Sequence, residues 1–164
     1  MNPKLETSLV ALEFSRHFTT ALLDAIPEDQ YCHQPFPGAN HALWVLGHLP
    51  CVDAFLMQVC GGPADSQLEK MQPLFGMHST PTPQRSNYPP LAEVRAWYQA
   101  ARQNVLDWLR GQDEQQLRTP LPDPLKQIAA DRLALVARLA IHESAHAGQL
   151  TVVRKSLGLA PVFA

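Results

Sequence analysis

The sequence carries little charge, and its charges are balanced. Charged residues make up 17% of the 164 residues and the formal net charge is -2, with no run of five or more basic residues. Proteins that bind nucleic acid carry a basic patch that neutralises phosphates, so this composition argues against a nucleic-acid partner.

Long apolar runs are also absent. No stretch reaches the roughly eighteen consecutive apolar residues that a membrane-spanning helix needs, and the first seven residues lack the charged-then-apolar layout of a signal peptide. We therefore expect a cytoplasmic protein that does not enter a membrane.

Cysteine is scarce and odd in number. The chain has three cysteines, Cys32, Cys51 and Cys60, without CxxC spacing. An odd set of this kind argues against a disulfide framework, and buried or incidental thiols are the simplest expectation.

Apolar residues recur at helical spacing in four segments. These segments predict helices at residues 5–26, 90–111 and 126–157, and a further helix that Asn40 caps and that ends at Gly61. In the first helix the apolar residues with helical spacing are Ala11, Phe14, Phe18, Ala21, Leu22 and Ala25. In the second helix Pro50 removes a backbone hydrogen bond, which predicts a kink just after His48.

The pattern predicts an all-α protein with a single domain over residues 1–164. Four helices without a strand pattern or an internal repeat are typical of a four-helix bundle. The connection between the second and third helices, residues 63–89, is proline-rich, with a short helical turn expected near residues 66–70. Its length permits a topology other than up-and-down, and its residues 75–78 can reach a pocket mouth or lie in solvent.

Two histidines lie on one face of the last helix. His142 and His146 are four residues apart, so their rings stack one turn above each other and can converge on one ion. Alternatively, the two rings are ordinary core histidines whose nitrogens are hydrogen-bonded by neighbouring carbonyls or waters. A third candidate, His48, comes from the second helix, and three protein ligands with an open position are the pattern of catalytic zinc.

The same stretch, His142 to His146, also matches the HExxH motif of zinc proteases, in which Glu143 would be the general base. Zincins take a third ligand from downstream, yet no His, Glu or Asp follows His146. We therefore expect Glu143 to be solvated or to contact a residue that binds the metal, and we keep the protease as a remote alternative.

Two motifs together resemble the DinB-like (DinB/YfiT) metal-binding family. They are Trp44-x-x-Gly-His48 in the second helix and His142-x-x-x-His146-x-Gly-Gln149 in the last, and the resemblance covers nearly the whole chain. It implies a four-helix bundle of DinB/YfiT-like topology, often a homodimer, with zinc or nickel held by His48, His142 and His146. Some relatives use thiols such as bacillithiol or mycothiol in transferase or isomerase reactions, and many have no assigned reaction.

Four other residues lie near the predicted site. His41 shares a helix face with His48 and either lines the pocket or is solvated at the helix start. Cys51 is a possible further ligand or a buried thiol. Arg138, one turn before His142, either binds the carboxylate of a thiol cofactor or substrate or pairs with an acid. Gly148 within the last helix predicts a close neighbour, either a helix or a ligand.

The favoured function is a metal-dependent thiol S-transferase in which a low-molecular-weight thiol is bound as thiolate and delivered to an electrophile. A metal-stabilised dimeric bundle without catalysis, of stress-response type, is the second hypothesis.

Overall fold

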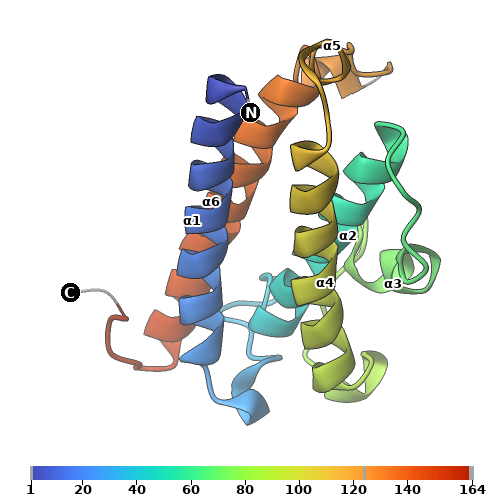
Figure 1. Cartoon of the computed structure of the whole chain (residues 1–164). Helices are drawn as coiled ribbons and strands as arrows, with labels where there is room; N and C mark the ends of the chain where they lie inside the picture. Colours follow the sequence, from blue (N-terminus) through green and yellow to red (C-terminus); the bar gives the residue numbers. More distant parts are fainter. Residues whose placement is uncertain (1, 124, 163–164) are drawn as a thin grey trace.

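The computed structural model describes residues 2–123 and 125–162, and within them the regular secondary structure is helical, without a β-strand (Figure 1). The long helices are α1 (Pro3–Asp24), α2 (Ala42–Val59), α4 (Leu91–Arg110) and α6 (Arg132–Ser156). The shorter elements are α3 (Leu68–Phe75), α5 (Glu114–Leu117) and the 3-10 turns Glu28–Gln30, Arg85–Asn87 and Leu125–Gln127. The all-helical prediction is confirmed.

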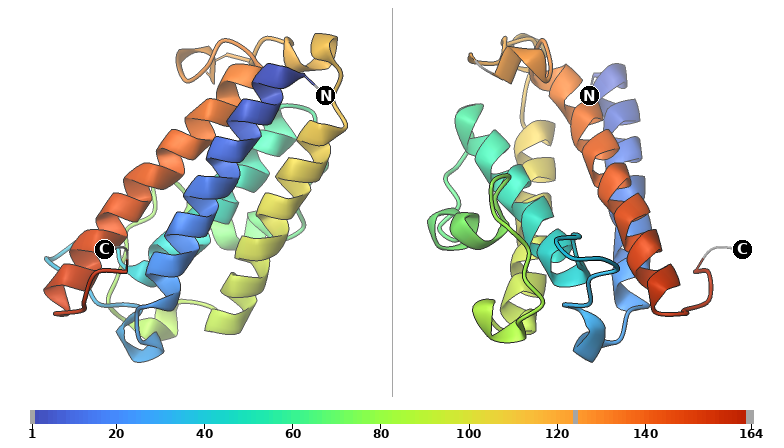
Figure 2. Two further views of the ribbon diagram at one scale, coloured as in Figure 1. Left: turned by 60° about the vertical axis from the view of Figure 1, so that its left-hand side comes forward. Right: turned by 180° about the vertical axis from the view of Figure 1, so that it is seen from behind.

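The long helices form a bundle in which the first and last helices are neighbours. Helix α1 packs most extensively against α6, and α2 against α4. Both views of Figure 2 show α1 and α6 running in the same direction, while α2 and α4 run opposite to them. Because α2 and α4 are parallel, the chain between them must return along the bundle, and it contains α3. The long connection that the sequence predicted between the second and third helices is therefore the segment that returns the chain, so that α2 and α4 can run parallel.

Side-chain caps explain where the helices begin. Asn2 accepts backbone hydrogen bonds at the start of α1, and Asp131 accepts one from Ala134 at the start of α6. Helix α6 consequently begins at Arg132, later than the predicted residue 126. Helix α2 is capped by the His41 ring, so the prediction of Asn40 as its cap was wrong.

The buried face of α1 is not the one that its aromatic residues predicted. Phe14 is 68% exposed, and Ala11 and Ala25 are also exposed. The core face instead contains five leucines together with Ser15 and Thr19, whose hydroxyls donate to carbonyls of their own helix. These local bonds satisfy the hydroxyls, so this stripe can be buried, and it consists of Leu5, Leu9, Leu12, Ser15, Thr19, Leu22 and Leu23.

Helix α2 is the apolar centre of the bundle. Among the described residues it alone is long and apolar enough to cross a membrane, yet 78% of that stretch is buried inside the fold. It continues through the buried Pro50 to Val59, and the expected kink stays a prediction.

A buried cluster of four charges joins the long helices. Arg16 of α1 contacts Asp53 of α2 at 3.0 Å and Glu143 of α6 at 2.8 Å. Arg102 of α4 contacts Asp53 at 2.9 Å and Glu143 at 2.7 Å. The side chains of Asp53 and Glu143 are at most 2% exposed. Each helix contributes one charge and the sum is zero, so the cluster holds the bundle in one register.

Candidate metal centre

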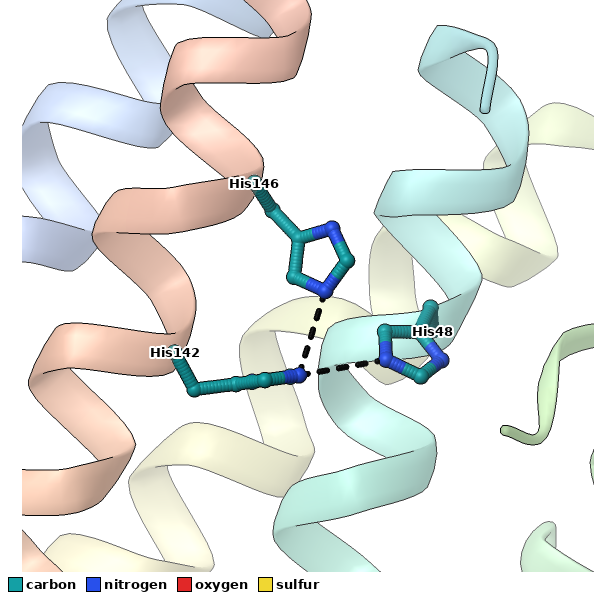
Figure 3. A group of neighbouring side chains, drawn as sticks. All are labelled: His48, His142 and His146. Atoms are coloured by element: carbon teal, nitrogen blue, oxygen red, sulfur yellow. Dashed lines mark hydrogen bonds between the residues drawn. The ribbon is translucent and has the colours of Figure 1, made fainter. Parts of the chain in front are cut away.

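Three imidazole rings from two helices meet inside the bundle. The Nε2 atom of His142 lies 3.1 Å from Nε2 of His146 and 3.3 Å from Nε2 of His48 (Figure 3). His48 and His146 are buried and His142 is partly buried. Among the described residues this is the group of metal-ligating side chains whose ligand atoms converge, all within 4.8 Å of one another.

The spacing of these nitrogens fits a tetrahedral ion. Zinc–nitrogen distances of about 2.0–2.1 Å at tetrahedral angles separate two ligand nitrogens by about 3.3–3.4 Å. The observed separations of 3.3 Å and 3.1 Å are close to this value. All three ligand atoms lie within 4.8 Å of one another, so a modest movement of the His48 and His146 rings lets the three residues hold a divalent cation.

Hydrogen bonds at the far side of two rings fix their tautomers. The Nδ1 atom of His48 lies 2.7 Å from the carbonyl oxygen of Phe75, and Nδ1 of His146 lies 2.8 Å from Oε1 of Gln149. Since these oxygens only accept, each Nδ1 carries the proton and each Nε2 presents a lone pair. Asn40 in turn donates to the same Gln149 oxygen at 3.0 Å.

This arrangement of protons leaves a lone pair without a donor. Two unprotonated Nε2 atoms, of His48 and His146, face Nε2 of His142, which can donate at most one proton. One of the two lone pairs then points at another nitrogen with nothing to accept. A cation between the rings satisfies all three nitrogens together, so the chemistry of the site favours one.

Burial keeps the rings neutral at physiological pH. It lowers the pKa of His48 and of His142 to about 4, and it also lowers the pKa of His146. For His142 the neighbouring His146 and His48 lower the pKa further. A metal ligand must be the unprotonated imidazole, so these shifts prepare the site for binding at pH 7.

The motif in α2 has a physical explanation in the structure. The Trp44 ring stacks on His48 with ring centroids 4.3 Å apart, and its Nε1 donates to Ser79. Gly47 faces the Phe75 ring so closely that a Cβ there would lie 2.5 Å from the ring's Cγ. Only a glycine at position 47 lets the Phe75 ring approach α2 this closely. The backbone carbonyl of Phe75 then reaches the His48 ring. The sequence predicted that residues 75–78 can reach a pocket mouth and placed Gln149 in the α6 motif, but it predicted neither Phe75 nor Gln149 as a hydrogen-bond partner of a histidine. The i, i+3 spacing of His146 and Gln149 was a usable signal for that role.

The placement of Glu143 corrects an expectation. It was expected to be solvated or to contact a residue that binds the metal, but it is fully buried and its carboxylate contacts Arg16 and Arg102. Neighbouring residues on a helix lie about 100° apart around the axis, so Glu143 faces the charge cluster while His142 faces the other two histidines. A carboxylate held in this way is unavailable as the general base of a protease.

A cavity of about 620 Å³ opens beside His142. Arg138 and Cys51 line it, as do Met77 and His78 from the connection after α3, so the loop does reach a pocket mouth. Burial raises the pKa of the Cys51 thiol to about 11, so it stays protonated at neutral pH. Of the three histidines His142 lines this cavity, so a small molecule in the cavity can reach the His142 side of the triad.

Two residues lie elsewhere than the sequence suggested. The His41 ring is fully buried, accepts a hydrogen bond from the backbone of Trp44 and contacts the Thr82 carbonyl at 2.9 Å, so it is absent from the cavity lining. Gly148 is exposed, and a Cβ there would meet no atom within 4 Å. No other helix of the described chain passes close to it.

Comparison with known proteins gave one family. The sequence model of the DinB superfamily matches residues 11–150, which is most of the chain. No curated protein gives a significant match.

Proposed function

The chain belongs to the DinB superfamily, and on that premise we propose that it is a metal-dependent thiol S-transferase. His48, His142 and His146 would hold a zinc or nickel ion, and a low-molecular-weight thiol such as bacillithiol or mycothiol would occupy the open coordination position. The electrophile would enter from the cavity beside His142. One observation carries the proposal, namely that three imidazole nitrogens converge and that one of the three histidines, His142, lines a cavity of about 620 Å³.

The proposed thiol transfer requires little from side chains other than the three histidines. A divalent cation would supply the positive charge that keeps a thiol deprotonated at neutral pH. The sulfur then forms a bond to the electrophilic carbon, the leaving group departs with the bonding electron pair, and the thiol proton passes to solvent. The protein's part is to orient the rings through Phe75 and Gln149 and to keep most water out through the apolar cavity wall.

A metal-stabilised bundle without catalysis is the second candidate. The observation in its favour is that the triad joins α2 to α6, which belong to the two different helix pairs of the bundle. An ion bound there would stabilise the fold by a free energy that grows with the logarithm of its affinity, even if no thiol ever reached it.

The first experiment measures the metal. Elemental analysis of freshly purified protein is expected to give close to one zinc or nickel ion per chain, and His146→Ala is expected to lose it. His17→Ala is the matched control, because His17 is an exposed histidine on α1 outside the site. A wild-type protein without metal, which also fails to bind added zinc, refutes the proposal.

The second experiment separates the enzyme from the scaffold. Metal-loaded protein is incubated with bacillithiol, mycothiol, glutathione or cysteine and with 1-chloro-2,4-dinitrobenzene, and thioether formation is followed by absorbance. Turnover that is lost in His146→Ala and kept in His17→Ala supports the transferase. Stabilisation by metal without turnover with any thiol supports the scaffold.

We also propose that the protein is a homodimer in the cytoplasm. Several large apolar residues are exposed on neighbouring helices, including Val10 and Phe14 of α1 and Ile141 and Val152 of α6, at 49–68% exposure. Apolar residues clustered on a helix pair are typical of a protein contact. Gly148 lies between Ile141 and Val152 on the exposed side of α6, where a partner helix has room to approach.

A further inference from the structure

The cavity beside the triad has walls that are mainly apolar. Val52, Phe55 and Leu56 of α2 form one side, and Leu135 and Leu139 of α6 form the other. Because the residues from Leu135 to His142 span about two turns of helix, the cavity extends roughly 10 Å along α6 away from the triad. Its volume of about 620 Å³ is in the range of small-molecule sites.

Arg138 is a solvent-exposed cation that lines this cavity. Within residues 2–123 and 125–162, Arg138 has neither an ion pair nor a hydrogen bond. The other arginines on α6 are engaged, Arg132 over the Trp108 ring and Arg154 with backbone carbonyls. A guanidinium offers five donors in a planar fork that suits an oxyanion.

The other ionisable groups facing the cavity leave Arg138 unpaired. Glu69 at the start of α3 and His78 in the following connection line the same cavity. Glu69 lies beyond ion-pair distance of Arg138, since no contact within 4.0 Å joins them among the described side chains. An acidic ligand therefore meets a free cation next to apolar surface.

We infer that this cavity binds an amphipathic anion, an apolar body that carries one oxyanion group, with Arg138 pairing the oxyanion and the leucine-lined wall covering the body. The inference deepens the proposed function, since it names the substrate class for the same site. Arg138 is one helical turn from His142, about 6 Å along the axis. A ligand anchored at Arg138 thus places its neighbouring carbons beside the triad.

Binding of simple probes tests the inference. Decanoate, decan-1-ol and decyltrimethylammonium share one apolar chain and differ in charge, and their dissociation constants are measured by isothermal titration calorimetry. Decanoate is expected to bind at least tenfold more tightly than the other two. Shortening the acid from ten to eight carbons is expected to weaken binding roughly fourfold per methylene. Equal binding of the three probes, or no dependence on chain length, overturns the inference.

Two substitutions locate the charge. Arg138→Met keeps a long apolar side chain and is expected to weaken decanoate binding about tenfold while leaving decan-1-ol unchanged. Lys155→Met removes a cation from the same helix outside the cavity and is expected to change neither. Tighter binding of decyltrimethylammonium, lost in Glu69→Gln, would assign the cavity to cations and refute the inference.

Metal-free protein separates this result from the proposed function. A carboxylate could also bind an ion at the triad, so the titration is repeated on chelator-treated wild type and on His146→Ala, after circular dichroism confirms their helical content. Binding through Arg138 is expected to survive in both. If the protein holds no metal but still binds decanoate through Arg138, the proposed function fails and the inference stands. If metal binds and Arg138→Met changes nothing, the inference alone fails.

Discussion

Glu143→Gln removes one charge from the buried cluster that joins the four long helices. The carboxylate is fully buried and contacts Arg16 at 2.8 Å and Arg102 at 2.7 Å. Neutralising it leaves two guanidinium groups with Asp53 as their remaining partner, so the cluster gains a net positive charge away from water. Breaking a buried ion pair in this way costs about 3–5 kcal/mol.

The loss is large enough to measure directly. For a protein of this size each kcal/mol lowers the melting temperature by roughly 2–4 °C, so Glu143→Gln is expected to melt about 6–20 °C below wild type. Urea unfolding of chelator-treated protein gives the free energy without any contribution from bound metal. Glu13→Gln is the matched control, because Glu13 pairs with Arg110 at the surface and its loss should change stability by less than about 0.5 kcal/mol.

A double variant tests whether net charge is the cause. Arg16→Met in the Glu143→Gln background restores neutrality and leaves Arg102 with its two contacts to Asp53, at 2.9 Å and 3.0 Å. The double variant is expected to lose about 1–3 kcal/mol less than the sum of the two single variants. Additive losses, or a Glu143→Gln protein as stable as Glu13→Gln, would refute the role assigned to the cluster.

Three further predictions concern single positions. Gly47→Ala puts a methyl group 2.5 Å from Cγ of the Phe75 ring and should cost about 1–3 kcal/mol in unfolding free energy and weaken zinc binding in calorimetry. Burial lowers the pKa of His41 to about 4, so the unfolded chain takes up a proton below pH 6.5 that the native state excludes. Between pH 6.5 and pH 4 the unfolding free energy of wild type should therefore fall by up to about 3 kcal/mol more than that of His41→Asn. Urea unfolding of metal-free protein measures this difference. If the protein is the homodimer that we propose, Phe14→Glu should convert it to a monomer in sedimentation velocity.

Each of these has a control on the same chain. Gly148→Ala, where a Cβ meets nothing within 4 Å, should leave the unfolding free energy unchanged or raise it. If Gly47→Ala changes the unfolding free energy by the same amount as Gly148→Ala, that result contradicts the packing argument. His17→Asn, at an exposed histidine, should keep the pH dependence of wild type. Phe36→Glu, at an exposed loop residue, should stay dimeric. If the Phe14→Glu variant stays dimeric, the dimer contact lies on another face of the protein.

Short-range signals predicted the helices and the histidines well. The apolar spacing predicted the long helices because a helix must bury one stripe, and the i, i+4 spacing predicted that His142 and His146 share a face. The start of α6 was misplaced because the Asp131 cap overrides the apolar pattern before it. In α1 the apolar positions picked out by their spacing include the exposed Phe14, since spacing alone does not say which of two apolar faces is covered.

By itself, then, the sequence determined which residues lie on which helical face, because the helix repeat is a local property of the backbone. Only the tertiary structure decided what each face meets. It brought His48 to within 3.3 Å of His142 and gave His48 and His146 their hydrogen-bond partners. It also buried Glu143 between two arginines from other helices, where a short motif had suggested a base. Contacts between segments distant in the chain depend on how whole helices pack, and no local pattern encodes that.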